Sequence, residues 1–405
     1  MNAAQRIERA ARESYGRLLG YLARESRDLA ACEDALGDAF VSALETWGRN
    51  GVPQRPDAWL LTAARNRLRS AARHGAVRKR AASLLALLNE EALDTQEITV
   101  DARVPLMFVC AHPAIDTRVR TPLMLQTVLG LDAATIARTF MVSPASMAKR
   151  LVRAKAKIKQ AHISFELPGP ELWAERLQSV LDAIYGAYGQ SWDFAATAED
   201  HAALSSEAIH LAELIALALP NEAEAQALLA LLLYCEARSN ARVDGDRFVA
   251  LEQQDTQRWD LEMIAHAEQH LRAASTHGTQ GRYQLEAALQ SCHVARRLHG
   301  IDNRAEVELL YEALVELTGA LGAKVGYCAA IATHRGAAAG LKVLACVQDA
   351  RLATHQPYWA LRGELCAQLG KRDSALEAYS RAVGLTITKT VRDFLLRRMA
   401  TLDRD

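Results

Sequence analysis

The stretch Leu131 to Gln160, LDAATIARTFMVSPASMAKRLVRAKAKIKQ, decides the fold of the middle of the chain. It predicts two helices joined by a tight turn at Phe140-Met141-Val142, with Asp132 capping the first helix. The second helix begins at Ser143-Pro144, where a hydroxyl caps the helix and proline occupies its first position. Its apolar residues recur at helical spacing and form one stripe: Met147, Leu151, Ala154 and Ile158.

Basic residues flank that stripe, and no acid occurs between Ala133 and Phe165. A short helix, a turn and a basic second helix form the helix-turn-helix pattern, whose second helix lies in the major groove of DNA. The alternative is an ordinary solvated basic helix in a bundle, which the capped turn and the lack of acids disfavour. The stretch therefore predicts DNA binding.

Composition sets the fold class for the rest of the chain. The 405 residues are enough for two or three domains, half of them are hydrophobic, and alanine and leucine dominate. Runs of β-branched residues bounded by glycine or proline hardly appear, so we expect an all-α fold.

The net charge of zero hides an asymmetry along the chain. Residues 1–166 carry 25 lysines and arginines against 17 acids, a net charge of +8, whereas residues 167–405 carry 23 against 31, a net charge of −8. The two halves therefore have different partners, or each other as partner.

Cysteine usage indicates the compartment. The seven cysteines are scattered and include no C-x-x-C pair, which suits buried thiols in a reducing cytosol. The first ten residues, MNAAQRIERA, are polar and charged, unlike a signal peptide, and the longest apolar run is too short to span a bilayer. We expect a cytoplasmic protein with no membrane contact.

Residues 3–22 and 28–47 predict two amphipathic helices. In the second, a buried stripe is expected from Leu36, Phe40, Ala43, Leu44 and Trp47. Asp34 and Asp38 are four residues apart and share the opposite, exposed face. This acidic face is either simple solvation or a docking surface for a basic partner helix.

A third helix is predicted to begin near Asp57, after a loop rich in turn residues. Arg65, Arg69 and Arg73 fall along one of its faces, and the segment Arg65 to Arg80 holds seven basic residues and no acid. Such a row is suited to contacts with phosphates. Trp59 lies near the face of Asn66, although by itself a core position is the more common one for this residue.

An acidic-faced helix, a basic helix, a linker and a helix-turn-helix follow one another in this order. Over roughly residues 10–163 the chain resembles bacterial RNA polymerase sigma factors of the extracytoplasmic-function type. The resemblance implies a region-two-like domain at 1–80, an acidic linker at 81–103 and a region-four-like helix-turn-helix domain at 104–166. The linker would pass through polymerase channels that otherwise hold nucleic acid, although a solvated loop fits its acids equally well.

Three groups of site residues follow from the resemblance. The acidic-faced helix would bind the clamp coiled coil of core RNA polymerase, and the second domain would meet its flap. The clamp contact is carried over to Asp34, Asp38 and Phe40. The basic helix would capture the minus-ten promoter element as it melts, through Trp59, Arg65, Asn66, Arg69 and Arg73. The recognition helix would read the minus-thirty-five element through Ser146, Lys149 and Arg150, with Arg153 and Lys155 on phosphates.

Residues 167–405 form an extension that a minimal sigma factor lacks, and LPGP at 167–170 marks the expected boundary. Ten helical segments are expected, at about 171–189, 200–219, 222–237, 259–275, 282–299, 304–320, 325–334, 336–350, 356–369 and 372–384. One pair resembles a tetratricopeptide repeat through Trp359, Gly363, Gly370, Ala375, Tyr379 and Ala382, with Tyr379 filling the space left by the small residues. A stacked helical array of this kind would bind an unknown protein or ligand.

A subgroup of the sigma family carries such a tetratricopeptide-like helical extension, and the chain is similar to it over its whole length. The resemblance implies that the extension regulates the factor. One hypothesis is an intramolecular contact in which the acidic extension rests against the basic half and competes with DNA or polymerase. The opposite hypothesis is that the extension braces the promoter complex.

No catalytic motif is visible, so we expect a non-enzyme without cofactors. We expect no metal site either, because Cys110 and His112 have too few potential ligands nearby and are better explained by packing. Two other functions remain open. A stand-alone helix-turn-helix regulator would bind DNA without polymerase, and a tetratricopeptide-type scaffold would use its basic half for RNA or an acidic protein.

Overall fold

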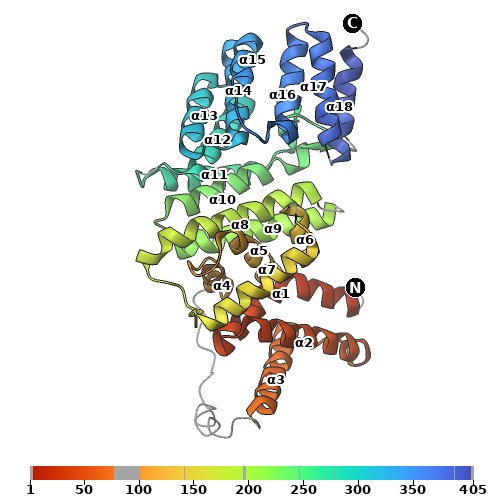
Figure 1. Cartoon of the computed structure of the whole chain (residues 1–405), viewed down its shortest axis with the longest axis vertical. Coiled ribbons are helices and arrows are strands. Elements are labelled where there is room, and N and C mark those ends of the chain that lie inside the picture. The colour runs from red at the N-terminus through yellow and green to blue at the C-terminus, as the bar shows by residue number, and fades with distance from the viewer. Residues whose placement is uncertain are drawn as a thin grey trace. The chain divides into compact units, whose positions relative to one another are not determined.

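The structure is a computed structural model, and it describes residues 3–76, 101–140, 142–194, 198–245, 247–278, 280–386 and 388–402. These residues are almost entirely helical, which confirms the all-α prediction (Figure 1). Their one hairpin pairs β1 (Val243–Asp244) with β2 (Arg247–Phe248). The predicted acidic linker at 81–103 lies outside the described residues up to position 100.

The chain divides into two compact units. The first holds residues 1–191 with 196–218, and the second holds residues 192–195 with 219–405. The first unit therefore includes two helices beyond the LPGP segment, because α8 and α9 pack into its core with Val180, Leu181 and Ile215.

Except for two helices between residues 103 and 127, which were not predicted, the helices of the first unit lie where the sequence predicts them. They are α1 (Ala3–Ser26), α2 (Leu29–Asn50), α3 (Pro56–Ala76), α4 (Arg103–Cys110), α5 (Thr117–Thr127), α6 (Ala133–Thr139), α7 (Pro144–Gln160), α8 (Trp173–Phe194) and α9 (Ala198–Ala218), with a short 3-10 turn at Pro170–Leu172. Apolar stripes of α1, α2 and α3 meet in one core that contains Leu19, Leu22, Leu36 and Leu60. The segment around Cys110 is packed as predicted, and its thiol lies 3.4 Å from the Thr127 hydroxyl.

One predicted core residue lies outside the core. Leu36, Ala43 and Trp47 of α2 are buried, but Leu44 is 53% exposed and lies on the surface near Val41, which is 54% exposed. Position 44 follows Ala43 by one residue, so a helix rotates it about 100° away from the buried stripe. The prediction that Leu44 is buried was wrong.

The second unit is a succession of helices, each of which contacts the next one along the chain (Figure 1). They are α10 (Ala223–Glu236), α11 (Leu261–Ser275), α12 (Arg282–His299), α13 (Arg304–Thr318), α14 (Leu321–Arg335), α15 (Ala337–Ala345), α16 (Gln356–Gln368), α17 (Arg372–Leu385) and α18 (Lys389–Leu402). Short 3-10 turns lie at Ser239–Ala241, Leu251–Gln253, Thr256–Arg258 and Leu352–Thr354.

The predicted close pair is present in α16 and α17. A Cβ added at Gly363 would lie 2.8 Å from Cδ1 of Tyr379, so only glycine lets this ring cross. Two elements were not predicted. One is α18, whose Val391, Phe394 and Leu395 have helical spacing, and the other is the hairpin, whose Phe248 packs edge-on against Phe394 at 5.5 Å.

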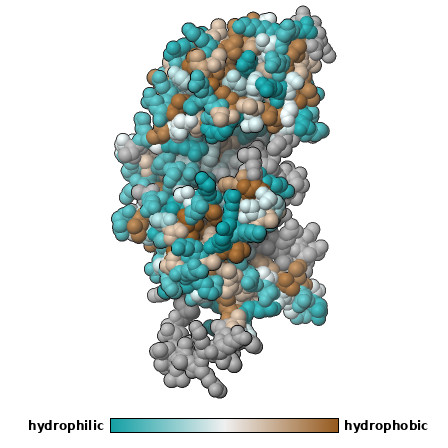
Figure 2. All heavy atoms as spheres, viewed as in Figure 1, coloured by the Kyte–Doolittle hydropathy of each residue, from teal (hydrophilic) through white to brown (hydrophobic). Residues whose placement is uncertain are grey.

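The surface of the described chain is mixed. Figure 2 shows apolar residues in small separate patches among polar ones on the face that it draws. Among the described residues no helix is long and apolar enough to cross a membrane.

Candidate nucleic-acid interface

The basic helix α3 is held against α1 by its first turn. Asp57 accepts a hydrogen bond of 2.8 Å from the Ser14 hydroxyl and forms an ion pair with Arg17. Leu60 and Ala64 are fully buried on the same side of the helix. The remaining face of α3 is therefore turned toward solvent.

The predicted minus-ten residues are divided between that face and the core. Asn66 and Arg69 are exposed, and Arg65 is half-buried and paired with Glu25. Trp59 is also half-buried and packs edge-on against Trp47, with ring centroids 5.5 Å apart. The side chain of Arg73 lies outside the described residues. Trp59 thus has the core contact that favours a structural role, although its other side stays accessible.

A cleft of about 700 Å³ opens beside α3. The corner between α1 and α2 lines it with Glu25 and Arg27, α3 adds Arg65 and Arg69, and Lys159 enters from the end of α7. Two predicted minus-ten arginines therefore share one cleft with the end of the predicted recognition helix.

The helix-turn-helix is built as its sequence predicts. The Asp132 carboxylate accepts hydrogen bonds from the backbone N–H groups of Ala134 and Thr135 and caps α6. The Ser143 hydroxyl accepts one from Ser146 N at 3.2 Å and caps α7. The predicted stripe of Met147, Leu151, Ala154 and Ile158 is buried.

The predicted minus-thirty-five residues lie on different sides of α7. Lys149 and Arg153 are exposed, Ser146 and Arg150 are half-buried, and Lys155 is buried. The first four project from the solvent side of the helix. Lys155 is on the opposite side, where its ammonium forms an ion pair with Glu33 of α2.

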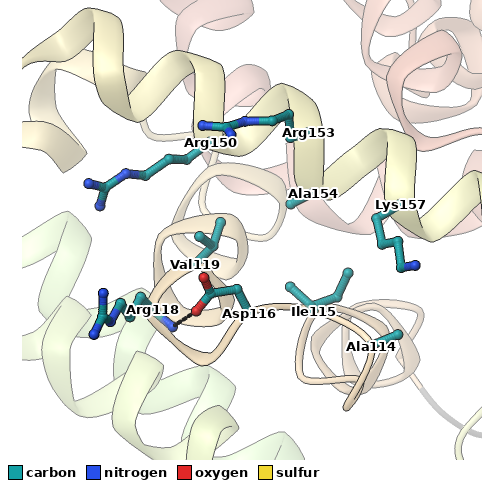
Figure 3. Close-up of a pocket in the computed structure, with 9 residues that line it drawn as sticks. All are labelled: Ala114, Ile115, Asp116, Arg118, Val119, Arg150, Arg153, Ala154 and Lys157. Atoms are coloured by element: carbon teal, nitrogen blue, oxygen red, sulfur yellow. Dashed lines mark hydrogen bonds between the residues drawn. The ribbon is translucent and has the colours of Figure 1, made fainter.

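A basic cleft of about 420 Å³ lies between α7 and the start of α5. Arg150, Arg153 and Lys157 line it from α7, and Arg118 lines it from α5 (Figure 3). Arg150 and Arg118 extend toward the same end of the cleft, and Lys157 lies at the other end. Among the described residues, Asp116 is the one acid that lines it, and it caps α5 by accepting a hydrogen bond from Arg118 N at 2.9 Å. Four basic side chains and one acid line the cleft, a charge balance that suits a phosphate backbone.

The acidic face of α2 carries apolar residues as well. Asp34 and Asp38 are exposed, as predicted, and Phe40 is half-buried. The exposed Val41 and Leu44 lie on the next turns, so the face combines carboxylates with apolar side chains. Asp38 also forms an ion pair of 2.9 Å with Arg67 of α3.

Several residues of the site were not among the predicted ones, including Glu25 and Lys159 at the cleft beside α3. Arg118 and Lys157 line the basic cleft, and Glu33 holds Lys155. Lys157 follows Arg153 by one helical turn, a spacing that could have identified it. Arg118 and Glu33 meet α7 only in three dimensions, so the sequence held no signal for them.

The described residues contain no group of three or more histidines, cysteines or acids placed to hold a metal ion. Cys32 and Cys110 are buried, and burial raises the pKa of Cys32 to about 11 and that of Cys110 to about 12. Thiols with such pKa values are unreactive at neutral pH.

Comparison with known proteins gives two family matches. Residues 11–78 match sigma-70 region 2, and residues 176–275 match a family of unknown function, DUF6596. The first match covers α3 and α2 with the acidic face, and the second begins within α8.

An uncharacterized protein of Rhizobium meliloti (strain 1021) is 34% identical over 379 residues, which cover 91% of this chain and 89% of that protein. The similarity therefore extends through both compact units. No solved structure matches the chain.

Proposed function

Because the chain belongs to the family of its Rhizobium meliloti relative and is a sigma-70 family factor by its region 2, we propose that the protein is an alternative sigma factor of the extracytoplasmic-function type. Sigma-70 factors are not enzymes, and through region 2 they bind core RNA polymerase and promoter DNA. The finer proposal is that α3 captures the minus-ten element, α7 reads the minus-thirty-five element, and the helical extension regulates both.

The observation that carries the proposal is the presence of two basic helices in one compact unit with an acidic and apolar helix face. The α3 helix offers Asn66 and Arg69 to solvent, as a helix that holds melted DNA must do. The α7 helix offers Lys149, Arg150 and Arg153 beside the basic cleft. Its capped N-terminus suits entry into a major groove.

The polymerase contact is proposed for the exposed face of α2. Asp34 and Asp38 supply charge for a basic partner helix, and Val41 and Leu44 supply apolar area that is open to solvent. Protein interfaces typically combine such an apolar centre with a polar rim.

Run-off transcription with core RNA polymerase, on the DNA upstream of the protein's own gene or on a DNA library, tests the proposal. We expect a discrete transcript only when this protein is present. Leu44→Asp should abolish core binding and the transcript, because it replaces apolar area at the centre of the proposed contact with a charge that must stay solvated. Leu309→Asp on α13 is the matched control, since Leu309 is 63% exposed and far from region 2 in sequence.

Failure to bind core polymerase and to yield a transcript would contradict the proposal. If duplex DNA still bound with sequence preference, a stand-alone helix-turn-helix regulator would replace it. If the extension regulates the factor, variants of the extension should change the amount of transcript without changing the promoter that is selected.

A further inference from the structure

Two glycines of α1, Gly16 and Gly20, lie where the backbone of the second domain crosses this helix, and we call this contact the glycine seat. Gly16 and Gly20 lie one turn apart, and a Cβ added at Gly16 would lie 2.0 Å from the carbonyl oxygen of Val128. A Cβ at Gly20 would lie 2.6 Å from the carbonyl oxygen of Ala102. Glycine inside a helix costs about 1 kcal/mol relative to alanine. The gain that offsets this cost is a close approach between region 2 and the backbone of the second domain.

A buried ion pair joins the same two domains at α2 and α7. The Lys155 and Glu33 side chains are 9% and 16% exposed, and no other acid is paired with this lysine in the described chain. Burial raises the pKa of Glu33, and Lys155 opposes that shift. At the rim, Lys159 forms a second and more exposed pair with Asp28.

This contact conflicts with promoter binding. The Lys155 ammonium cannot reach a phosphate while it is paired with Glu33. The minus-ten and minus-thirty-five elements are named for positions about 25 base pairs apart, roughly 85 Å of duplex at 3.4 Å per base pair. Packed helices lie about 8–10 Å apart. A unit in which α7 packs on α2 cannot bridge that span.

The extension holds the other side of the second domain. Arg103, which begins α4, is 5% exposed and forms ion pairs with Asp101 and with Glu207 of α9. Burial raises the pKa of Glu207, and Arg103 opposes that shift. The segment 101–103 therefore lies between Gly20 of α1 and Glu207 of α9. A smaller contact, 3.5 Å between Arg120 Nη1 and the Ser179 hydroxyl, joins α5 to α8.

We propose that α1, α2 and α9 form an intramolecular clamp, which holds the helix-turn-helix domain on region 2 and prevents α3 and α7 from binding both promoter elements at once. The clamp assigns a role to α9 within the stretch that matches the family of unknown function. It has to open before both promoter elements can be bound. The inference rests on the proposed function for its consequence, whereas the contact itself can be tested separately.

The first experiment removes the glycine seat in the full-length protein. Gly16→Ala with Gly20→Ala adds two methyl groups that the closed contact cannot hold, while alanine favours the α1 helix itself. Gly37→Ala with Gly48→Ala in α2 is the matched control, because nothing lies within 4 Å of either added Cβ. Thermal unfolding followed by circular dichroism verifies that each variant is folded.

Two measurements show whether the contact between region 2 and the second domain has been weakened. Hydrogen exchange of peptides covering 102–110 and 151–160 should become faster in the seat variant and remain unchanged in the control. The affinity of the protein alone for promoter duplex should rise about tenfold, because the competent open state becomes more populated.

A second variant tests the part played by the extension. Glu207→Gln leaves Arg103 with a single acid, and we expect faster exchange of 102–110 and tighter duplex binding. Glu213→Gln on the same helix is the control, since Glu213 is exposed and its ion pair is with His210 of its own helix, one turn away.

Unchanged exchange in both the seat variant and Glu207→Gln would overturn the clamp. Faster exchange without any gain in duplex affinity would overturn its inhibitory role. A protein that never supports transcription with core polymerase would contradict the proposed function instead, and the exchange data would still decide whether the contact exists.

Discussion

The helices α3 and α7 are the two basic helices of one compact unit, and they differ in where their cations lie. Arg65 and Arg67 of α3 pair with Glu25 and Asp38 at the surface, where all four side chains are between 32% and 57% exposed. Lys155 of α7 pairs with Glu33 in a site where both side chains are mostly buried.

Both helices carry cations, but the paired cations of α3 are partly open to solvent and Lys155 of α7 is not. Exposed ion pairs contribute roughly 0–1 kcal/mol, so a phosphate can replace their acids at little cost. Breaking a buried pair leaves an uncompensated charge and costs about 3–5 kcal/mol. The proposed function therefore requires little change at the α3 ion pairs, whereas Lys155 of α7 could bind a phosphate only after leaving Glu33 of α2.

The largest expected effect comes from the buried pair itself. Glu33→Gln should weaken the contact between α2 and α7 by about 3 kcal/mol, because Lys155 would stay buried without a counter-charge. Hydrogen exchange of 151–160 measures this change. Asp34→Asn, one residue away and exposed, is the control, and equal exchange in the two variants would show that the pair does not hold α7.

A smaller effect separates the proposed targets of the two helices. Arg150→Ala should weaken binding to promoter duplex by about 1–3 kcal/mol and relax base preference, because a base-edge contact is lost. Asn66→Ala should instead weaken binding to single-stranded minus-ten DNA. Fluorescence anisotropy on duplex and single-stranded probes measures both, and the reverse pattern would exchange the roles proposed for α3 and α7.

The phosphate contacts should appear in the salt dependence. Arg153→Ala should lower affinity for all sequences alike and reduce the slope of log affinity against log salt by about 1, since one phosphate contact is lost. Titrations from low to moderate salt give the slope. A slope equal to that of the parent protein would remove Arg153 from the DNA contact.

The smallest effect is expected at an exposed pair. Arg67→Ala should change the free energy of unfolding by less than about 1 kcal/mol, and high salt should abolish the difference, because Asp38 and Arg67 are half open to solvent. Urea unfolding at two salt concentrations measures this. A loss of several kcal/mol would mean that α3 is held as firmly as α7.

Local chemistry made much of the molecule predictable from its sequence. The caps at Asp132 and Ser143 act through hydrogen bonds within three residues, and the stripe from Met147 to Ile158 repeats at the period of one helix. The helix-turn-helix, the first three helices and the pairing of Gly363 with Tyr379 were therefore predicted correctly. The assignment of Lys149, Arg150 and Arg153 to DNA stays a prediction, and the structure leaves these side chains at least partly open to solvent.

Tertiary structure alone decided which of these residues are accessible. The positions of Leu44 and Lys155 along their own helices do not show whether they are buried, because their exposure depends on which helix packs beside them. Glu33 and Lys155 are separated by 122 positions, Arg103 and Glu207 by 104, and periodicity within a single helix carries no information about such pairs. The absence of side chains at Gly16 and Gly20 is explained only by the backbone of another segment that crosses α1 in the folded protein. The sequence determined the two basic helices, and packing between distant segments determined that one is open and the other is held.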